Sequence, residues 1–365
     1  MSAEGPDVIT EMPVLVLFPH NRCNCRCVMC DIWRIREVRQ VTPADLEPHL
    51  DSIRRLKVRW VVFSGGEPQL NRELSKLAEM LRAENIRLTL LTAGLLLEAH
   101  ADEVAAMVDD IIVSLDGPAQ IHDQIRGVPQ AFHRLQRGIA AVRSLRPQME
   151  ISVRSTVQKA NHHALRDTVA AARRLGANSV SFLAADLTSQ AFNRAEPWDR
   201  ERQQGIALNA AETDTLEGEI EALIASREMA AGFIRENEDK LRRIVQHFRA
   251  HLGSAAAESP RCNAPWVSAV VEADGSVRPC FFHRSLGNIK NQTLHKILNG
   301  PEAVRFRREL DVARNPVCRR CVCSLYIPVE LPVAVTAESL GQRICRLRLK
   351  PTKNLEGSSA LGLWR

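Results

Sequence analysis

Short apolar runs alternate with helical stretches over the first half of this 365-residue chain. Strands that are apolar throughout, with helices between them, indicate a parallel sheet that is covered on both faces. Six runs have the length and the aliphatic content of such strands: VLVLFPH (14–20), RWVVFSGG (59–66), RLTLLTAG (87–94), DIIVSLDG (110–117), EISVRSTV (150–157) and SVSFLAAD (179–186). The alternation therefore predicts an α/β fold, either a doubly wound sheet or a partial or full β/α barrel.

Residues that can carry chemistry gather at the ends of these predicted strands. The first strand ends at a loop with four cysteines, RCNCRCVMC (22–30), and the second ends at GGEP (65–68). The third ends at Thr92, and the fourth ends at Ser114 and Asp116. Reactive groups of α/β proteins lie at the carboxyl ends of the strands, so we expect the cysteines to share a crevice with the glycine pair and a carboxylate.

The cellular compartment decides how the cysteines are interpreted. No apolar run is long enough to cross a bilayer and the first residues lack the apolar core of a signal peptide, so we expect a soluble, cytoplasmic protein without a membrane partner. The net charge of +6 is spread along the chain and the aromatic content is only 4%, which argues against a nucleic-acid partner. In a reducing compartment, ten cysteines indicate metal or redox chemistry rather than a disulfide framework.

The cysteines form two groups with no member between Cys30 and Cys262, which indicates two separate sites. In the first group, Cys23, Cys27 and Cys30 have the spacing C-x3-C-x2-C. Three thiolates in one loop suit three irons of a cubane cluster, and because such clusters are commonly held by four cysteines, a non-protein ligand would complete the site. Zinc is the alternative, but zinc normally takes a fourth protein ligand and leaves GGEP unexplained.

This loop resembles the cluster motif of the radical S-adenosylmethionine (radical SAM) superfamily. Members bind a [4Fe–4S] cluster through C-x3-C-x2-C, and the amino and carboxylate groups of SAM chelate the fourth iron. By that resemblance Cys25 is a bystander, GGEP is similar to the motif that holds the SAM amino group, and the fold is a partial (β/α)6 TIM-like barrel. The resemblance implies SAM contacts at Met29, Gly65, Gly66, Glu67, Pro68, Thr92, Ser114, Asp116, Arg126 and Arg154. Met29 departs from the family, which usually has an aromatic residue against the adenine, but methionine can make a soft contact there.

The second group of cysteines lies in the last third of the chain. Cys262 and Cys280 flank a strand-like segment with a central Asp-Gly turn, which predicts a β-hairpin. Cys318 and Cys321 then supply C-x2-C after a helical stretch. Two pairs make four thiolates, enough for one fully ligated cluster or for one structural zinc.

The order of these parts looks like the C-terminal auxiliary-cluster extension of radical SAM enzymes known as SPASM, or its shortened form, Twitch. The full form continues C-x2-C-x5-C-x3-C, whereas this chain has only Cys323 and Cys345 beyond the pair. The resemblance therefore implies the Twitch version with one auxiliary [4Fe–4S] cluster. Its ligands would be Cys262, Cys280, Cys318 and Cys321. A second, incomplete cluster and a zinc site remain alternatives.

Composition and motifs divide the chain into four predicted parts. Residues 1–187 form the radical SAM partial barrel, residues 188–260 a helical insertion with a linker, residues 261–350 the auxiliary-cluster domain, and residues 351–365 a polar tail. An apolar stripe at helical spacing over residues 241–252 predicts a face that packs against the barrel or within the insertion. The insertion could cap the site and determine the choice of substrate.

The resemblance implies an enzyme that receives an electron from a donor such as flavodoxin or ferredoxin. The enzyme would cleave SAM to methionine and a 5′-deoxyadenosyl radical, which abstracts hydrogen from a substrate carbon. An auxiliary cluster could then accept an electron and give an oxidation, or Cys323 could return a hydrogen atom and give an epimerisation. A small buried residue or a spare ligand is the plainer interpretation of Cys323. Asp186, at the end of the sixth strand, is the best-placed general base by position.

We expect a sugar, an aminocyclitol or a nucleoside-like small molecule of secondary metabolism as the substrate. Relatives with this extension also modify ribosomal peptides, often with an N-terminal leader-binding domain, and only 22 residues precede Cys23 here. A peptide maturase that crosslinks or epimerises is therefore the first alternative. A non-catalytic Fe–S electron carrier or a zinc-binding module is the alternative from another class, although neither needs GGEP and SLDG at strand ends.

Overall fold

The computed structural model describes residues 7–194 and 196–328, so Cys345 and the predicted tail lie outside the described residues. Within these described residues, one sheet has nine strands in the order β6-β5-β4-β3-β2-β1-β7-β8-β9. Six of them lie within the six predicted runs: β1 (Val14–His20), β2 (Trp60–Gly65), β3 (Arg87–Thr92), β4 (Asp110–Ser114), β5 (Glu150–Val157) and β6 (Ser179–Ala184). The predicted α/β fold is confirmed.

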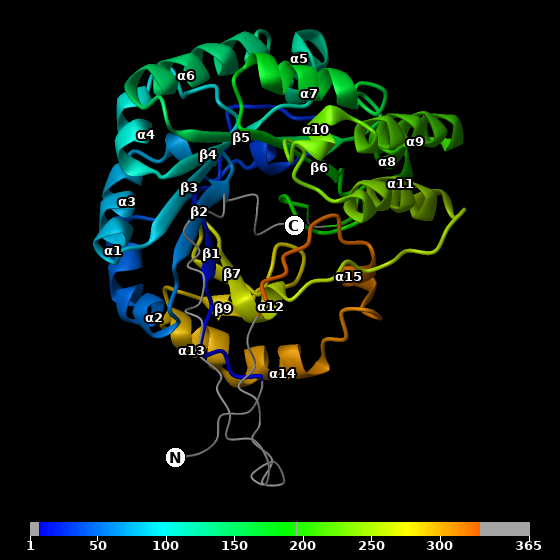
Figure 1. Ribbon diagram of the computed structural model, residues 1–365. Coiled ribbons are helices and arrows are strands. Elements are labelled where there is room, and N and C mark those ends of the chain that lie inside the picture. The colour runs from blue at the N-terminus through cyan, green and yellow to red at the C-terminus, as the bar shows by residue number, and fades with distance from the viewer. Residues whose placement is uncertain (1–6, 195, 329–365) are drawn as a thin grey trace, which may run out of the picture.

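These six strands are parallel, and each lies beside its neighbour in the chain. Right-handed crossovers between consecutive strands place all connecting helices on one face, as in a barrel. The helices that cover this outer face are α1 (Pro43–Leu46), α2 (Leu50–Arg55), α3 (Leu74–Ala83), α4 (Ala101–Met107), α5 (Ala119–Arg126), α6 (Ala131–Leu145) and α7 (Leu165–Arg174) (Figure 1). Short 3-10 helices occupy Ile32–Arg34, Glu47–His49 and Pro68–Leu70. The strands β6 and β9 are the two edges, so the sheet stays open and the barrel is partial.

The two faces of the strands belong to different apolar clusters. Outward side chains such as Leu17, Phe63 and Leu90 join the helices in one large core. Inward side chains near the amino ends of the strands, among them Trp60 and Ile112, form a small separate cluster. Because that cluster fills the amino end of the interior, open space is left toward the carboxyl ends of the strands. No helix of the described ranges 7–194 and 196–328 is long and apolar enough to cross a membrane.

The predicted insertion continues the outer layer instead of forming a separate body. Its helices are α8 (Arg200–Ile206), α9 (Ala210–Ile224), α10 (Arg227–Ala230) and α11 (Glu238–Leu252). Helix α9 packs against α7, and α11 packs against β6. The stripe residues Leu241, Ile244 and Phe248 lie in the same core as the barrel strands, which confirms that this face packs against the barrel. Just before α11, the backbone of Phe233 accepts a hydrogen bond from Val180 at 2.8 Å and covers part of the β6 edge.

The C-terminal part extends the sheet on the other side. Its elements are α12 (Ala264–Val267), β7 (Ser268–Val271), β8 (Ser276–Arg278), β9 (Gly287–Asn288), α13 (Leu294–Asn299), α14 (Pro301–Glu309) and α15 (Pro316–Arg319). The strands β7 and β8 form the hairpin that the Asp-Gly turn predicts. The sequence did not predict that β7 pairs in parallel with β1, from Val14 beside Ser268 to Leu17 beside Val271.

The loops at the carboxyl ends of β1 and β2 touch each other. The backbone N–H of Glu67 donates to the carbonyl of Arg22 at 2.8 Å. Gly65 has a φ of 107°, in the left-handed region that glycine tolerates best. At Gly66, an added Cβ would lie 2.0 Å from the carbonyl oxygen of Arg22. The glycine pair therefore lets the second loop lie directly against the cysteine loop.

Replacing Gly66 with alanine should destabilise the protein. The new Cβ would push the backbone of Arg22 away, and such overpacking costs about 1–3 kcal/mol. The midpoint of urea unfolding, followed by circular dichroism, measures the change. Gly218→Ala in α9 is the control because no neighbouring atom lies within 4 Å of the added Cβ. We expect Gly218→Ala to unfold at an equal or higher urea concentration than the wild type, and equal midpoints for the two variants would contradict the close approach.

Candidate functional site

The first cysteine loop folds so that its thiols lie together. Cys23, Cys27 and Cys30 share one packed cluster with Cys25, which is only 1% exposed. Hydrogen bonds with the thiols of Cys23 and Cys27 raise the pKa of Cys25 far above that of a free thiol. Cys25 is therefore buried beside the other three thiols, and its role as a bystander stays a prediction. Three further thiols in one cluster match the donor set that a cubane with one open iron needs.

A buried ion pair fixes this loop to the ends of β4 and β5. Arg126 Nη2 lies 2.6 Å from Asp116 Oδ2, and Arg126 Nη1 lies 3.6 Å from Cys27 Sγ. Asp116 also accepts a hydrogen bond from the backbone N–H of Thr156 at 2.8 Å. A hydrogen bond from Cys25 and the positive charge of Arg126 lower the pKa of Cys27 to about 7, against the effect of burial. Since the thiolate is the form that binds metal, Arg126 supports the ligand state of Cys27. The negative charge of Asp116 acts against that thiolate, and the role of Asp116 is to hold Arg126.

The GGEP segment is held by the buried side chain of Glu67. Its carboxylate accepts hydrogen bonds from the Thr92 hydroxyl at 2.9 Å and from the backbone N–H of Ala93 at 3.0 Å. Burial raises the pKa of Glu67. Glu67 and Thr92 therefore join the carboxyl ends of β2 and β3. Pro68, the residue after Glu67, is also buried. In this structure Glu67 and Thr92 hold the GGEP loop in place, and its backbone lies against the cysteine loop at Arg22.

The remaining predicted SAM contacts lie on β4, on β5 and in the cysteine loop. Ser114 on β4 and Arg154 on β5 are register partners, so their side chains lie on one face of the sheet. Arg154 Nε donates to Ser181 Oγ on β6 at 3.3 Å, and burial lowers the pKa of Arg154. Met29 packs against both the main core and the cysteine cluster.

The segment after β6 is fastened onto the cysteine loop, and the sequence did not predict this contact. Arg194 forms an ion pair of 2.7 Å with Asp186 and donates to the backbone carbonyl of Met29 at 3.3 Å. The indole N–H of Trp198 donates to the carboxylate of Asp31 at 2.6 Å. Asp31 directly follows the last cysteine of the motif, which was the available sequence signal for its role.

The predicted general base, Asp186, is one partner of the ion pair with Arg194. The side chains of Arg194 and Asp186 are only 1% and 4% exposed, so the carboxylate is enclosed with its partner. In this position Asp186 holds Arg194 against the backbone of the cysteine loop. Its role as a general base stays a prediction, and the geometry gives it a positioning role.

The described cysteines of the second group surround a cavity of about 630 Å³. The thiol-bearing residues that line it are Cys262, Cys280, Cys318, Cys321 and Cys323. Asn263 fastens this region, because its backbone N–H donates to the carbonyl of Leu325 at 2.9 Å. His283 also lines the cavity, with Nε2 at 3.5 Å from Cys318 Sγ.

The thiols of the second set have a donor number that suits an iron–sulfur cluster or zinc. Within the described residues, no three cysteine, histidine, aspartate or glutamate side chains converge so that one metal ion could be held. The thiols instead lie around a cavity. Four cysteine thiolates around one cavity have the donor number of a fully ligated iron–sulfur cluster, and zinc is the alternative for the same donors.

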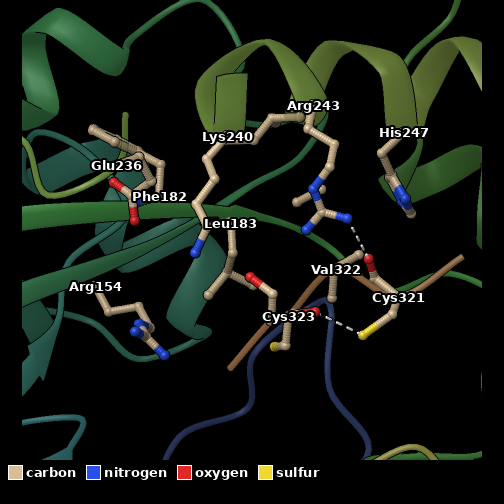
Figure 2. Close-up of a pocket in the computed structure, with 13 residues that line it drawn as sticks. Arg154, Phe182, Leu183, Glu236, Lys240, Arg243, His247, Cys321, Val322 and Cys323 are labelled. Carbon is tan, nitrogen blue, oxygen red and sulfur yellow. Dashed lines mark hydrogen bonds between the residues drawn. The ribbon is translucent and has the colours of Figure 1, made fainter. Parts of the chain in front are cut away.

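A second cavity, of about 540 Å³, adjoins the first. Its walls come from β5 with Arg154, from β6 with Leu183, and from α11 with Lys240 and Arg243 (Figure 2). Residues 321–324 close the remaining side, and Cys321, Cys323 and Ser324 line both cavities. A molecule in the second cavity would therefore lie between the carboxyl ends of the strands and the auxiliary thiols. We call it the strand-end cavity.

Comparison with known proteins agrees with this division into two sites. Residues 17–179 match the radical SAM superfamily, and residues 262–322 match SPASM, an iron–sulfur cluster-binding domain. The first match contains Cys23, Cys27 and Cys30, and the second contains the four predicted auxiliary ligands. The two domains indicate two iron–sulfur clusters.

Similar proteins extend over most of the chain. The AdoMet-dependent heme synthase of Methanosarcina barkeri is 26% identical over 295 residues, which cover 79% of this chain and 82% of that protein. The pre-heme d1 synthase of Dinoroseobacter shibae is 27% identical over 330 residues, covering 86% of this chain and 79% of that protein. Among solved structures, native anSMEcpe with bound AdoMet has a TM-score of 0.61 at 19% identity, over 84% of this chain and 86% of that chain.

The fold, the gathered thiols and the two domain matches lead to one assignment. A parallel partial barrel carries C-x3-C-x2-C at the end of its first strand, and a second set of thiols follows in the C-terminal part. This chain belongs to the radical SAM superfamily and carries a C-terminal SPASM-type iron–sulfur cluster-binding domain.

Proposed function

We propose that this enzyme oxidises a substrate held in the strand-end cavity. In this proposal Cys23, Cys27 and Cys30 hold the SAM-binding [4Fe–4S] cluster. A single auxiliary [4Fe–4S] cluster, as in the Twitch form, is held by Cys262, Cys280, Cys318 and Cys321. The observation that carries the proposal is that the strand-end cavity and the auxiliary-thiol cavity share a wall, which includes Cys321 and Cys323.

The shared wall favours oxidation among the reactions open to the family. When bound, SAM and its cluster supply hydrogen abstraction from an unactivated carbon, and the auxiliary cluster supplies an acceptor for the remaining electron. The chain itself positions the cluster ligands and the substrate. The Asp116–Arg126 pair fixes the first cysteine loop, and β6 and α11 form walls around the substrate. Cys323 lines both cavities and could also reach a substrate radical. Its role as a hydrogen donor in an epimerisation stays a prediction.

We further propose a tetrapyrrole as the substrate class. Both relatives described above are named as synthases of heme or pre-heme d1, and each aligns over most of this chain and most of its own length. The sugar, aminocyclitol or nucleoside expected from the sequence has no support from these relatives, and peptide maturation stays the alternative. A cytoplasmic location and an electron donor such as flavodoxin or ferredoxin belong to the same proposal.

Anaerobically reconstituted wild-type protein should contain about eight irons, because two cubane clusters hold four each. The triple variant Cys23→Ala/Cys27→Ala/Cys30→Ala should retain about four, because the auxiliary thiols remain. SAM should perturb the EPR spectrum of the reduced wild type only. Cys25→Ala is the control and should keep the wild-type iron content and the SAM effect. Zinc in place of iron at either set of thiols would contradict that cluster assignment.

The double variant Cys262→Ala/Cys280→Ala should separate SAM cleavage from substrate oxidation. With dithionite as reductant and coproporphyrin III as substrate, with and without iron, 5′-deoxyadenosine should still form. Oxidised porphyrin, detected by mass spectrometry, should fall by at least about tenfold, which corresponds to 1.4 kcal/mol in the barrier. Cys323→Ser is the matched control and should retain oxidation. If neither porphyrin stimulates 5′-deoxyadenosine formation in the wild type, the tetrapyrrole proposal is wrong.

A further inference from the structure

His283 lies between the two pairs of auxiliary thiols. Its side chain is only 8% exposed and lines the auxiliary-thiol cavity. In the sequence it follows Cys280 by three residues. Its Nε2 lies 3.5 Å from the Sγ of Cys318, which is 35 residues further along the chain. His283 therefore connects the end of the β7–β8 hairpin with the C-x2-C pair.

The backbone of the same residue contacts the thiol of Cys280. Burial raises the pKa of Cys280, and hydrogen bonds from the backbone N–H groups of Phe282 and His283 lower it. Hydrogen bonds to the charged form of a group stabilise that form, and the thiolate is the form of cysteine that binds metal. His283 thus touches two of the four predicted ligands, Cys280 through its backbone and Cys318 through its ring.

The imidazole ring is fixed from two sides. Phe306 of α14 packs against it edge to face, with the ring centroids 4.9 Å apart and the planes at 67°. Arg278 Nη1 donates to the backbone carbonyl of His283 at 3.0 Å. Arg278 is itself held by an ion pair of 3.0 Å with Glu272. A ring that is already fixed loses little conformational entropy when it forms a further hydrogen bond.

The contact with Cys318 has one direction once this thiol is a ligand. A ligand thiolate carries no proton, so it can only accept a hydrogen bond, and Nε2–H of His283 is the donor. Hydrogen bonds to the sulfur atoms are among the factors that set the reduction potential of an iron–sulfur cluster. Reduction adds negative charge, which a donor at the sulfur stabilises, so such a hydrogen bond raises the potential.

We propose that His283 holds Cys318 in place and raises the reduction potential of the auxiliary cluster. The inference rests on the proposed function, because it assumes that the auxiliary thiols hold a [4Fe–4S] cluster. A higher potential makes the cluster a better acceptor for the electron that an oxidation leaves on the substrate. His283 is a positioning residue, because it acts through Cys318.

Two substitutions at His283 separate the hydrogen bond from packing. Phenylalanine keeps a ring beside Phe306 but has no donor, whereas glutamine keeps an N–H donor without the ring. His133→Phe is the matched control, because His133 is exposed on α6 in the outer layer of the barrel. The same change of side chain is thereby made far from the auxiliary thiols in the sequence.

The variants are made in the full chain that also carries Cys23→Ala, Cys27→Ala and Cys30→Ala. This parent protein should hold the auxiliary cluster alone, so its EPR signal reports that cluster. After anaerobic reconstitution, iron and zinc content are measured first. The midpoint potential then comes from a redox titration followed by EPR at constant pH.

We expect His283→Phe to keep about four irons and to be reduced about tenfold less favourably than the parent, which is about 59 mV for a one-electron couple. His283→Gln should restore most of the parent potential, and His133→Phe should leave it unchanged. Activity does not enter either measurement.

An unchanged potential in His283→Phe would overturn the inference and leave the cluster assignment intact. Loss of iron from both His283 variants would also overturn it, because the imidazole would then be a ligand or a packing element. Loss of iron from His283→Phe, with His283→Gln at the parent potential, would support the role of the donor. Zinc in the parent protein would contradict the proposed function and this inference with it.

Discussion

The parallel pairing of β1 with β7 is the contact on which both cysteine sites depend. Strand β1 leads directly into the loop of Cys23, and the hairpin that begins with β7 leads to Cys280. Four residues of each strand are in register, so backbone hydrogen bonds set how far apart the two sets of thiols lie. The strand-end cavity occupies the space that this pairing leaves between the barrel and residues 321–324. A shift of this register would move the auxiliary thiols relative to the whole barrel.

Two buried ion pairs hold the first cysteine loop against the strands of the barrel. The Asp116–Arg126 pair fixes it from β4, and the Asp186–Arg194 pair fixes it from the segment after β6. Burying an ion pair costs desolvation that its attraction only partly returns, so such pairs are weak sources of stability. Their value here is geometric, because Arg126 and Arg194 each also contact the cysteine loop. Removing one partner would leave an uncompensated buried charge beside the thiols.

The parts of this architecture that follow from local pattern could be predicted from the sequence. The six apolar runs became the six parallel strands, and the Asp-Gly turn became the β7–β8 hairpin. The pairing of β7 with β1 could not be predicted, since an apolar strand does not specify its neighbour. Lys240 and Arg243 were missed because, in the sequence, they resemble the solvent-facing residues of an amphipathic helix. Only the covering of α11 by residues 321–324 turns their side of the helix into a cavity wall.

The lining of the strand-end cavity restricts the substrate more than the fold does. Radical SAM enzymes with an auxiliary-cluster extension act on different kinds of molecule, so the fold alone cannot select one. Lys240 and Arg243 of α11 line the strand-end cavity together with Glu236 and residues 321–324. A molecule in this cavity would contact α11 on one side and the auxiliary segment on the other. Both cations belong to α11 and not to a barrel strand, so substitutions in one helix could change substrate choice while both sets of thiols stay in place.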